Sequence, residues 1–354
     1  MELAQRVQDA LQRGERAVSF STPTFGSAAD ALVLPEGVSL RLTPAAGLSD
    51  LREIAEAEFF DKWKGLGGYV AITAGAKAAC FSVLRAVTKP GDRVLIIAPA
   101  WPSYEDICHA AGAVPIMLET DAASDFCIET DALKCAMKVH KPRVIIVTSP
   151  NNPTGRIYSA AEITTLHEVA RHSGAALVID ESFSKINFDM RTWQSAVLGD
   201  LEQAVIINSF SKNFHLQGLR LGSMLAKPTL LDKIVTVHQA IVSSAPSASQ
   251  HLAIQYFKRH GPRIPEYCQQ RELAISFAER SGWSFTAPQG TFYIFPRLAD
   301  VAAFVDAARA HCIYVLVGTA FGSSYVDHVR FCFGKPLAEL EEMLSALGGA
   351  SNAA

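Results

Sequence analysis

The segment NSFSKNFHLQGLRLG, residues 208–222, combines residue types whose spacing could support covalent chemistry. Lys212 stands directly after Ser211, and Arg220 follows eight residues later among Phe, Leu and Gly side chains. A lysine held in an apolar pocket near a second cation loses proton affinity and becomes a nucleophilic amine that can form a Schiff base. The hydroxyls of Ser209 and Ser211 and the guanidinium of Arg220 could hold a dianionic phosphate beside that amine.

A Schiff-base lysine beside a phosphate cradle predicts an aldehyde cofactor that carries a phosphate, namely pyridoxal 5′-phosphate (PLP). The alternative for an isolated lysine is a solvated side chain, because Lys is rarely buried. PLP also needs a carboxylate near its protonated ring nitrogen, and Asp180 at the end of the apolar run LVID could supply it. A helix N-cap is the alternative role for this aspartate.

Three other segments offer further contacts for such a cofactor. Gly75, Ala76 and Lys77 open a helix-forming run, so their backbone N–H groups could bind a phosphate, although they lack the spacing of a P-loop. Trp101 could stack on the flat ring, or could simply belong to the core. Asn152 in SPNNPTG could donate to the phenolic oxygen of the ring, although the same sequence also suits an ordinary turn.

Short runs of apolar, often β-branched residues predict the strands that must position these side chains. Such runs are typical of strands buried on both faces of a sheet. Helical patterns alternate with them, and the segment 159–174 shows capping-box spacing between Ser159 and Glu162 and ends at Gly174. This alternation predicts an α/β fold with a mostly parallel, doubly wound sheet and helices on both faces. The predicted strands are 93–99, 143–150, 176–182 and 203–210.

Polar or aromatic residues follow each of these predicted strands at once. Trp101 comes after the first strand, Asn152 after the second and Lys212 after the fourth, while Asp180 lies near the end of the third. Ligands of open α/β sheets bind beyond the carboxyl ends of the strands. We therefore expect the four segments to converge on one cleft.

The pattern changes after about residue 255, which predicts a second domain. A helical region extends to about residue 282, and short strand-like pieces such as TFYIFP and VRFCFG follow. We predict a large PLP-binding domain at 43–262 and a smaller α+β domain, joined by a long helix, built from 1–42 and 263–354. The first 18 residues read as an amphipathic helix, and the tail GGASNAA is expected to be disordered.

Composition limits the class of protein. The chain has 354 residues, 49% of them hydrophobic, and a formal net charge of −3, which argues against a nucleic-acid partner. No apolar run reaches the roughly 18 residues that a membrane span needs, and the N-terminus does not resemble a secretion signal. The seven cysteines form no CxxC pair, so we expect reduced, mostly buried thiols, a cytoplasmic location and no metal site.

With these motifs in view, the chain resembles a class I/II aminotransferase of the fold-type I PLP-dependent enzymes over roughly residues 42–334. The most specific motif is Ser-x-Ser-Lys followed by Gly-x-Arg-x-Gly, and SPNNPTG and DES agree in order and spacing. The segment from AGAKAAC to APAWPSY is particularly similar to bacterial aspartate-aminotransferase-like members. TPAAGLSDLRE, PQGTFYIFP and GTAFGSSYVDHVRFCFG also match the family.

The resemblance implies a role for each matching residue. Lys212 would form the internal aldimine and shuttle a proton between Cα and C4′, and Asp180 would pair with the pyridinium nitrogen. Asn152 would bond the ring O3′, and Arg330 would hold the substrate α-carboxylate as a planar fork. The implied site comprises catalytic Lys212 and Asp180; cofactor-binding Gly75, Ala76, Lys77, Trp101, Asn152, Asp180, Phe183, Ser209, Ser211, Lys212 and Arg220; and substrate-binding Arg330, Asn152 and Trp101.

Three positions depart from the family pattern. Phe183 replaces the usual tyrosine that donates to O3′, so the internal aldimine should hold its proton to higher pH, which titration of Phe183→Tyr would test. Leu42 replaces a tyrosine that reaches the phosphate of the partner subunit. Ser149 replaces the first asparagine of the Asn-Pro-x-Asn-Pro motif.

The resemblance implies transfer of an amino group from an L-amino acid to a 2-oxo acid by a homodimer. The alternative is another PLP-dependent reaction on the same scaffold: a decarboxylase, a lyase, a cyclising synthase or an oxidase. A regulatory PLP-fold domain without activity is disfavoured, because the lysine is present and there is no basic extension. A dicarboxylic substrate would need a second cation, for which Arg156, Lys185 and Arg191 are candidates, with surface placement as the alternative for all three.

Overall fold

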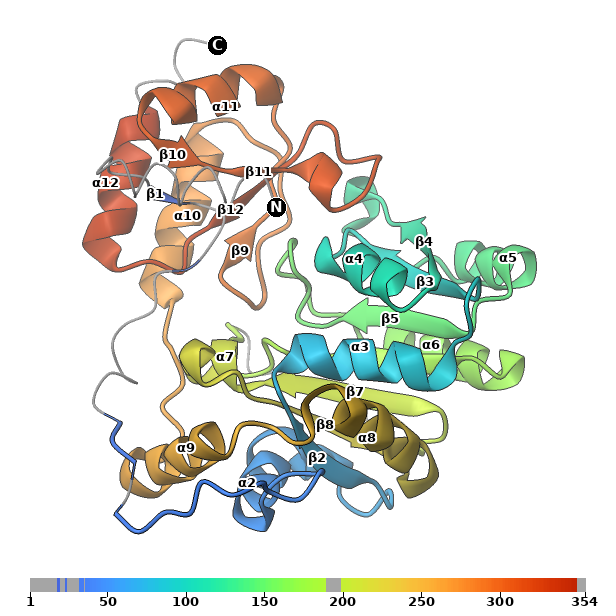
Figure 1. Cartoon of the computed structure of the whole chain (residues 1–354). Coiled ribbons are helices and arrows are strands. Elements are labelled where there is room, and N and C mark those ends of the chain that lie inside the picture. The colour runs from blue at the N-terminus through green and yellow to red at the C-terminus, as the bar shows by residue number, and fades with distance from the viewer. Residues whose placement is uncertain (1–17, 20–22, 24–31, 35, 189–198, 349–354) are drawn as a thin grey trace.

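A seven-stranded sheet forms the centre of the larger part of the molecule (Figure 1). The computed structural model describes residues 18–19, 23, 32–34, 36–188 and 199–348. The strand order is β2-β8-β7-β6-β5-β3-β4, and only β8 runs antiparallel to its neighbours. The predicted mostly parallel sheet is therefore confirmed. Its strands are β2 (Tyr69–Thr73), β3 (Arg93–Ala98), β4 (Val114–Glu119), β5 (Val144–Thr148), β6 (Ala176–Asp180), β7 (Ala204–Ser209) and β8 (Gly222–Ala226).

Helices cover both faces of this sheet, which explains why its central strands are apolar at successive positions. Along β5, Val144 and Ile146 pack into one hydrophobic cluster, whereas Ile145 and Val147 pack into another. The first cluster contains residues of α3 (Ala76–Val87), α4 (Ser103–Ala110) and α8 (Pro228–Val242). The second contains residues of α2 (Ser49–Ala55), α5 (Thr130–His140), α6 (Ala160–Ser173) and α9 (Ser247–His260).

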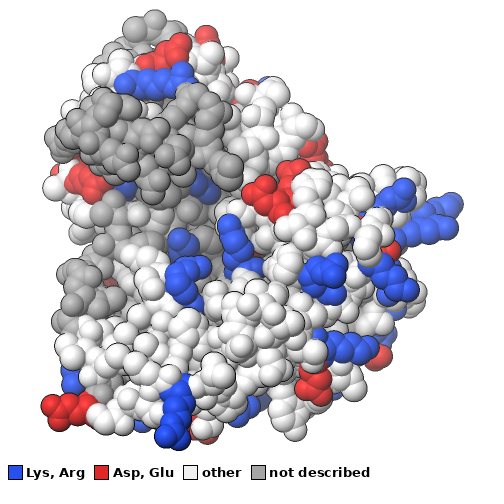
Figure 2. Space-filling view, in the orientation of Figure 1, with Lys and Arg blue, Asp and Glu red and all other residues white. Residues whose placement is uncertain are grey.

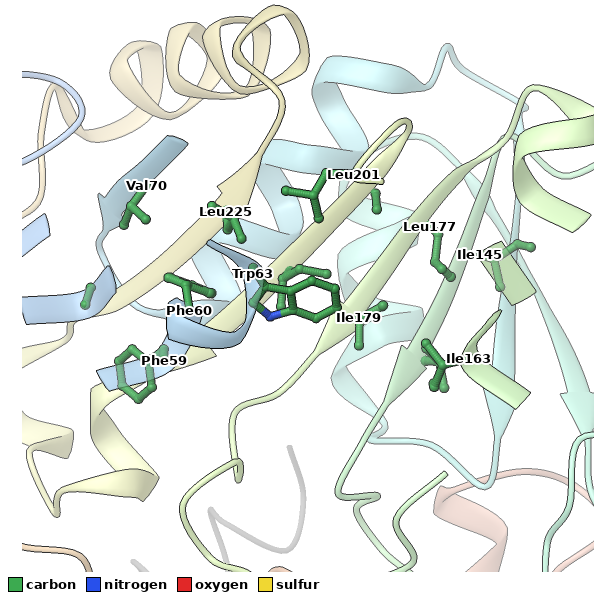
Figure 3. Close-up of a cluster of buried hydrophobic side chains, with 14 of the residues drawn as sticks. Phe59, Phe60, Trp63, Val70, Ile145, Ile163, Leu177, Ile179, Leu201 and Leu225 are labelled. Atoms are coloured by element: carbon green, nitrogen blue, oxygen red, sulfur yellow. The ribbon is translucent and has the colours of Figure 1, made fainter. Parts of the chain in front are cut away.

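A segment of two short, non-α helices lies against the second face of the sheet. It consists of the π-helix η1 (Glu56–Phe60) and the 3₁₀-helix η2 (Asp61–Trp63). Figure 3 shows Phe60 and Trp63 pointing towards strand residues such as Leu225 and Ile179, whereas the centre of the Phe59 ring lies 5.1 Å from that of Phe210. These large buried side chains pack the segment 56–63 against β6, β7 and β8.

Helix α6 forms where its end signals predict it. The Ser159 side chain accepts a hydrogen bond from the Glu162 backbone, and the Glu162 carboxylate accepts one from Ser159 N at 2.8 Å. Gly174 ends the helix with φ of 70°, a left-handed conformation that suits glycine.

The smaller part of the molecule is built around a three-stranded sheet in the order β11-β12-β9. A separate parallel pair joins β1 to β10, so the N-terminal and C-terminal regions of the chain meet there (Figure 1). The strands of this smaller part are β1 (Val18–Ser19), β9 (Tyr293–Ile294), β10 (Ile313–Tyr314), β11 (Leu316–Val317) and β12 (Val329–Cys332). Its helices are α10 (Cys268–Arg280), α11 (Val301–Ala310) and α12 (Leu337–Gly348).

One expectation about this region was wrong. The predicted long connecting helix is two helices, α9 and α10, separated by residues 261–267. Gly261 ends α9 with φ of 64°, and Pro262 and Pro265 in the connection disfavour a continuous helix. The predicted N-terminal helix and the predicted disordered tail lie outside the described residues, apart from Val18 in β1 and Gly348 at the end of α12.

The cysteines are unpaired but not mostly buried, which corrects another expectation. All seven are free thiols, and only Cys80, Cys108 and Cys332 are buried. Cys135 and Cys268 lie on exposed sides of α5 and α10. Within the described ranges, no helix is both long and apolar enough to cross a membrane.

Candidate active site

A cavity of about 360 Å³ lies at the carboxyl ends of the parallel strands, between the two parts of the molecule. Figure 2 shows Lys and Arg side chains bordering a hollow at the centre of the face that it displays. All four predicted strand-end segments contribute to the cavity wall. The lining residues are Pro23, Ala76, Lys77, Trp101, Tyr104, Thr148, Asn152, Asp180, Ser182, Phe183, Ser209, Ser211, Lys212, Gln217, Arg220, Tyr293 and Arg330.

Lys212 lies on the short helix α7 (Phe210–Asn213), which follows β7 directly. Ser209 caps this turn, because its hydroxyl accepts a hydrogen bond from Ser211 N at 3.2 Å. The pKa of the Lys212 amine is lowered to about 8, mainly by burial, and the nearby cations Arg330 and Arg220 contribute to the same shift. About a tenth of this amine is therefore neutral and nucleophilic at pH 7, far more than for an unperturbed lysine.

Asp180 ends β6 and is only 5% exposed. Its Oδ2 accepts a hydrogen bond from the Tyr104 hydroxyl at 2.6 Å, and its Oδ1 accepts one from Ser182 N at 2.9 Å. Burial raises the pKa of this carboxyl, whereas the two hydrogen bonds oppose that shift. The aspartate caps a turn rather than a helix, so the helix N-cap alternative does not apply. A buried carboxylate of this kind is suited to binding a cation.

The turn before α3 forms one wall of the cavity. Gly75 is the N-cap of α3 and has φ of 91°, which disfavours any residue with a side chain. A Cβ there would lie 3.0 Å from Arg220 Nη2, so the guanidinium lies directly against the turn. Ala76, Lys77 and Arg220 line the cavity, whereas Gly75 lies beside it. Helix N–H groups, a guanidinium and the hydroxyls of α7 together form a suitable anion site.

Trp101 and Lys77 lie together on the cavity wall. Lys77 Nζ is 4.7 Å from the centre of the Trp101 ring and donates to Ser103 Oγ at 3.1 Å. The Trp101 ring meets the Tyr104 ring edge-on, with an interplanar angle of 86°. Lys77 is exposed, so its ammonium group remains accessible from the cavity.

Arg330 on β12 approaches the cavity from the smaller part of the molecule. Its Nη1 donates to Asn152 Oδ1 at 2.8 Å, which leaves the Asn152 amide N–H groups free to donate elsewhere. The guanidinium carbon lies 4.1 Å from the Tyr293 ring centre and 5.1 Å from that of Phe321. A buried, planar guanidinium held in this way can bind a carboxylate through two parallel hydrogen bonds.

Phe183 also lines the cavity but cannot donate a hydrogen bond. Its ring meets those of Phe292 and Tyr293 at centroid distances of 5.4 and 6.0 Å. The residue is buried, so it forms an apolar wall where the family usually has a phenol.

The other positions singled out in the sequence lie elsewhere. Arg156 pairs with Glu162 at 3.0 Å, and Lys185 pairs with Glu58 at 3.1 Å, and neither lines the cavity. Arg191 lies outside the described residues. Leu42 is 82% exposed and also lies away from the cavity wall. Ser149 is buried, and its hydroxyl accepts from Tyr158 N at 3.1 Å.

Sequence reasoning missed several lining residues. Tyr104 is the most important of these, because it binds Asp180 and also lies 2.7 Å from Thr148 Oγ1. Both tyrosine and threonine stand at or beside the quoted strand-end segments, so their position was a usable signal, although their partners were not. Tyr293 lies in the motif PQGTFYIFP, which was used only as a family match. Pro23, Ser182 and Gln217 also line the cavity.

The residues present fit PLP. Lys212, whose amine is readily deprotonated, suits the aldehyde, and the buried carboxylate of Asp180 suits the ring nitrogen. The turn before α3 and Arg220 suit the phosphate. Trp101 offers a flat aromatic face in the same cavity. The fold and this set of residues define a PLP-dependent enzyme of fold-type I.

The family follows from comparison with known proteins. The family model for aminotransferase class I and II matches residues 42–347, so the chain belongs to that family. It is a PLP-dependent aminotransferase, as the sequence motifs predicted.

Relatives and solved structures agree with this assignment. An aspartate aminotransferase of Geobacillus stearothermophilus is 30% identical over 96% of this chain and 91% of its own length. An asparagine–oxo-acid transaminase of Streptococcus mutans is 24% identical over 96% of this chain and 91% of its own length. The crystal structure of an aspartate aminotransferase from Thermotoga maritima superposes with a TM-score of 0.88 at 22% identity, covering 99% of this chain and 96% of that one.

Proposed function

We propose that this aminotransferase takes its amino group from an acidic L-amino acid and passes it to a 2-oxo acid. The observation that carries the proposal is the presence of two separate cations on the cavity wall that are suited to carboxylates. Arg330 is buried and planar, and Lys77 is exposed beside Trp101. Of the two relatives described above, one is named for aspartate and the other for asparagine, so family membership alone leaves the amino donor open.

The cavity residues divide the work between holding the cofactor and holding the substrate. When bound, PLP supplies an electron-accepting ring that stabilises negative charge at the substrate Cα. Asp180, kept in place by Tyr104, would bind the ring nitrogen as a carboxylate. Asn152 would donate its amide N–H to the ring oxygen while its Oδ1 orients Arg330.

The phosphate would be held by the turn at Gly75 and Ala76, by the hydroxyls of Ser209 and Ser211, and by Arg220. Arg330 would fix the substrate α-carboxylate, and Lys212 would move a proton between the substrate Cα and the cofactor C4′. A pKa of about 8 suits this role, because the amine must both accept and return a proton near neutral pH.

Phe183, in place of the usual tyrosine, is the feature that leaves other PLP-dependent reactions as an alternative. Membership in the aminotransferase family supports transamination over decarboxylation, elimination, cyclisation or oxidation. Phe183 would then alter the acidity of the lysine–cofactor linkage rather than the type of reaction.

The proposed donor class is tested by exchanging Lys77. Lys77→Ala should lower kcat/KM for aspartate and glutamate about tenfold or more, since a charged hydrogen bond to a carboxylate is worth about 1.5–3 kcal/mol. The value for alanine should stay within about twofold, because alanine has no second carboxylate. Lys89→Ala, at an exposed lysine outside the cavity, is the matched control. Single-turnover formation of the oxo acid gives the readout.

Two results would overturn the proposed donor class. Equal losses for aspartate and alanine would assign Lys77 to cofactor binding instead. Unchanged kcat/KM for every donor would remove Lys77 from substrate recognition altogether.

We also propose a homodimer, which is typical of the family. Leu40, Leu42 and Val242 are exposed around a second cavity of about 350 Å³, and Ile241 is exposed beside Val242. Contiguous exposed apolar residues of this kind often mark a protein–protein interface.

The proposed domain division is 43–262 for the large domain and 1–42 with 263–354 for the small one, supported by the pairing of β1 with β10. Seven free thiols support a cytoplasmic location.

A further inference from the structure

A buried histidine on α8 binds the backbone of the turn that leads into α3. His238 Nε2 lies 3.1 Å from the backbone nitrogen of Ala74, and the histidine is only 1% exposed. Leu231, Ile234 and His238 recur at intervals of three and four residues along α8, and all three are buried. The histidine therefore stands on the core-facing stripe of the helix, where an apolar residue is the ordinary choice.

The direction of this hydrogen bond fixes the state of the ring. A backbone N–H can only donate, so His238 Nε2 is the acceptor and the neutral ring carries its proton on Nδ1. Burial lowers the pKa of His238, which favours this neutral form. The side chain therefore acts as a fixed acceptor for Ala74 N.

Two other elements fix the same turn. A Cβ at Gly222 on β8 would lie 2.6 Å from Ala76 N and 2.7 Å from the Gly75 carbonyl carbon, so β8 abuts the turn. Thr73 at the end of β2 donates from its hydroxyl to Gly75 O at 3.1 Å. The path of the chain from Ala74 into α3 is thus defined by β2, β8 and α8 together.

We propose that His238 is a positioning residue for the cofactor phosphate. By accepting from Ala74 N, it sets the direction in which the following N–H groups of Ala76 and Lys77 point into the cavity. His238 does not line the cavity, so it would act on the phosphate through the turn. The inference rests on the proposed placement of the phosphate at Gly75 and Ala76.

The test measures PLP binding to the whole chain in its cofactor-free form. His238→Leu removes the acceptor and keeps an apolar side chain of similar size, so the dissociation constant for PLP should rise about fivefold to tenfold. His238→Gln supplies a neutral amide oxygen as acceptor and should restore an affinity within about twofold of the original. The ³¹P NMR signal of bound PLP should move in His238→Leu and stay in place in His238→Gln.

Three comparisons distinguish a positioning role of His238 from a general loss of folded structure. His172→Leu makes the same exchange at an exposed histidine on α6 and should leave PLP affinity unchanged. Pyridoxal, which lacks the phosphate, should bind His238→Leu and the original protein equally well. Arg220→Gln should weaken PLP binding whether or not His238 has a role, because Arg220 lies directly against the turn.

The outcomes distinguish the role of His238 from the placement of the phosphate. If Arg220→Gln weakens PLP binding but His238→Leu changes neither the affinity nor the ³¹P signal, the role of His238 is refuted and the phosphate placement stands. If neither variant weakens PLP binding, the phosphate lies elsewhere, and both the phosphate placement and the role of His238 are refuted. Should His238→Leu fail to fold, a His238→Gln protein with a shifted ³¹P signal and a tenfold weaker affinity would also refute the proposal.

Discussion

Burial sets the protonation of the residues on which the site depends. Lys212 and Asp180 both lie where water is largely excluded, so each is shifted towards its neutral form. His215, three residues after Lys212, is shifted in the same way: burial, with a contribution from Lys212, lowers its pKa to about 4. The hydrogen bond between His215 Nε2 and the Tyr267 hydroxyl, at 2.7 Å, therefore involves a neutral ring at physiological pH.

The pKa of Lys212 predicts a pH profile for its reaction with an aldehyde. In the cofactor-free protein, the amine should react with pyridoxal at a rate that rises with pH around a midpoint near 8, not near the unperturbed value of about 10.4. The sign follows because a depressed lysine pKa makes the neutral, reactive amine available at lower pH. Stopped-flow absorbance measures the rate, and Lys212→Arg supplies the unreactive control.

Arg220→Gln should raise this midpoint, because Arg220 is one of the cations that lower the pKa of Lys212. Pyridoxal is used so that loss of phosphate binding does not enter the result. A midpoint near 10 in the original protein would contradict the assigned environment of Lys212.

The aromatic rings around Arg330 lead to a second prediction. Tyr293→Leu should raise KM for both the amino acid and the oxo acid about tenfold with a smaller change in kcat, since a desolvated cation–π contact is worth up to about 2 kcal/mol. Tyr293→Phe keeps the ring and should remain within about twofold. Steady-state kinetics give the readout, and equal losses in both variants would assign the effect to the hydroxyl instead of the ring.

At the scale of elements, two ion pairs connect the η1–η2 segment to the loop after β6. Lys62 binds Glu181 at 2.7 Å, and Lys185 binds Glu58 at 3.1 Å. Glu181 follows Asp180 directly, so this connection lies beside the carboxylate that faces the cavity. The pairs differ in burial: the Glu181 side chain is 3% exposed, whereas that of Glu58 is 20% exposed.

This difference predicts unequal costs for the same substitution. Glu181→Gln should lower the free energy of unfolding by about 3 kcal/mol, because it removes the buried carboxylate to which Lys62 donates. Glu58→Gln should cost under about 1 kcal/mol, as is usual for more exposed pairs. Urea titration followed by circular dichroism measures both, and similar losses would contradict the assignment of burial as the cause.

Much of the fold could be predicted from residue patterns, and the exceptions have physical reasons. The apolar strands and the capped helix α6 follow from local sequence, and so does the placement of Lys212, Asp180 and Asn152 at or just after the ends of strands. Which side chains meet across long sequence separations does not. The hydrogen bond from Tyr104 to Asp180 joins residues 76 positions apart, and nothing local specifies it. The break at Gly261 could have been read from the Gly-Pro pair.

At the scale of the whole molecule, aromatic side chains join the two parts beside the site. Phe295, Phe321 and Tyr325 of the C-terminal region pack with Phe126 and Ala98 of the large region. Hydrogen bonds follow the same boundary. Ala100 N donates to Phe321 O at 3.0 Å, and the Tyr325 hydroxyl donates to Thr120 O at 2.8 Å. Phe321 also faces Arg330, so these contacts help to fix the substrate side of the cavity relative to the cofactor side.

The proposed homodimer leads to a prediction at this scale. Leu42→Asp with Val242→Asp places two charges on the exposed apolar cluster and should convert the dimer to a monomer at micromolar concentration. Sedimentation velocity measures the change. Val139→Asp, at a residue of α5 that is also exposed, should leave the dimer intact. A monomer before any substitution would refute the homodimer, and a dimer that survives the double change would place the interface elsewhere.

The antiparallel direction of β8 has a consequence for the length of the chain around the site. The chain arrives along β7, turns through α7 and the 3₁₀-helix η4 (Gln217–Leu219), and leaves along β8, so Lys212 and Arg220 border one cavity. Inserting or deleting one residue between them would shift the guanidinium against the amine even if every functional side chain were kept. In natural variants of this protein, substitutions at 214–219 should therefore be tolerated more readily than insertions or deletions in the same segment.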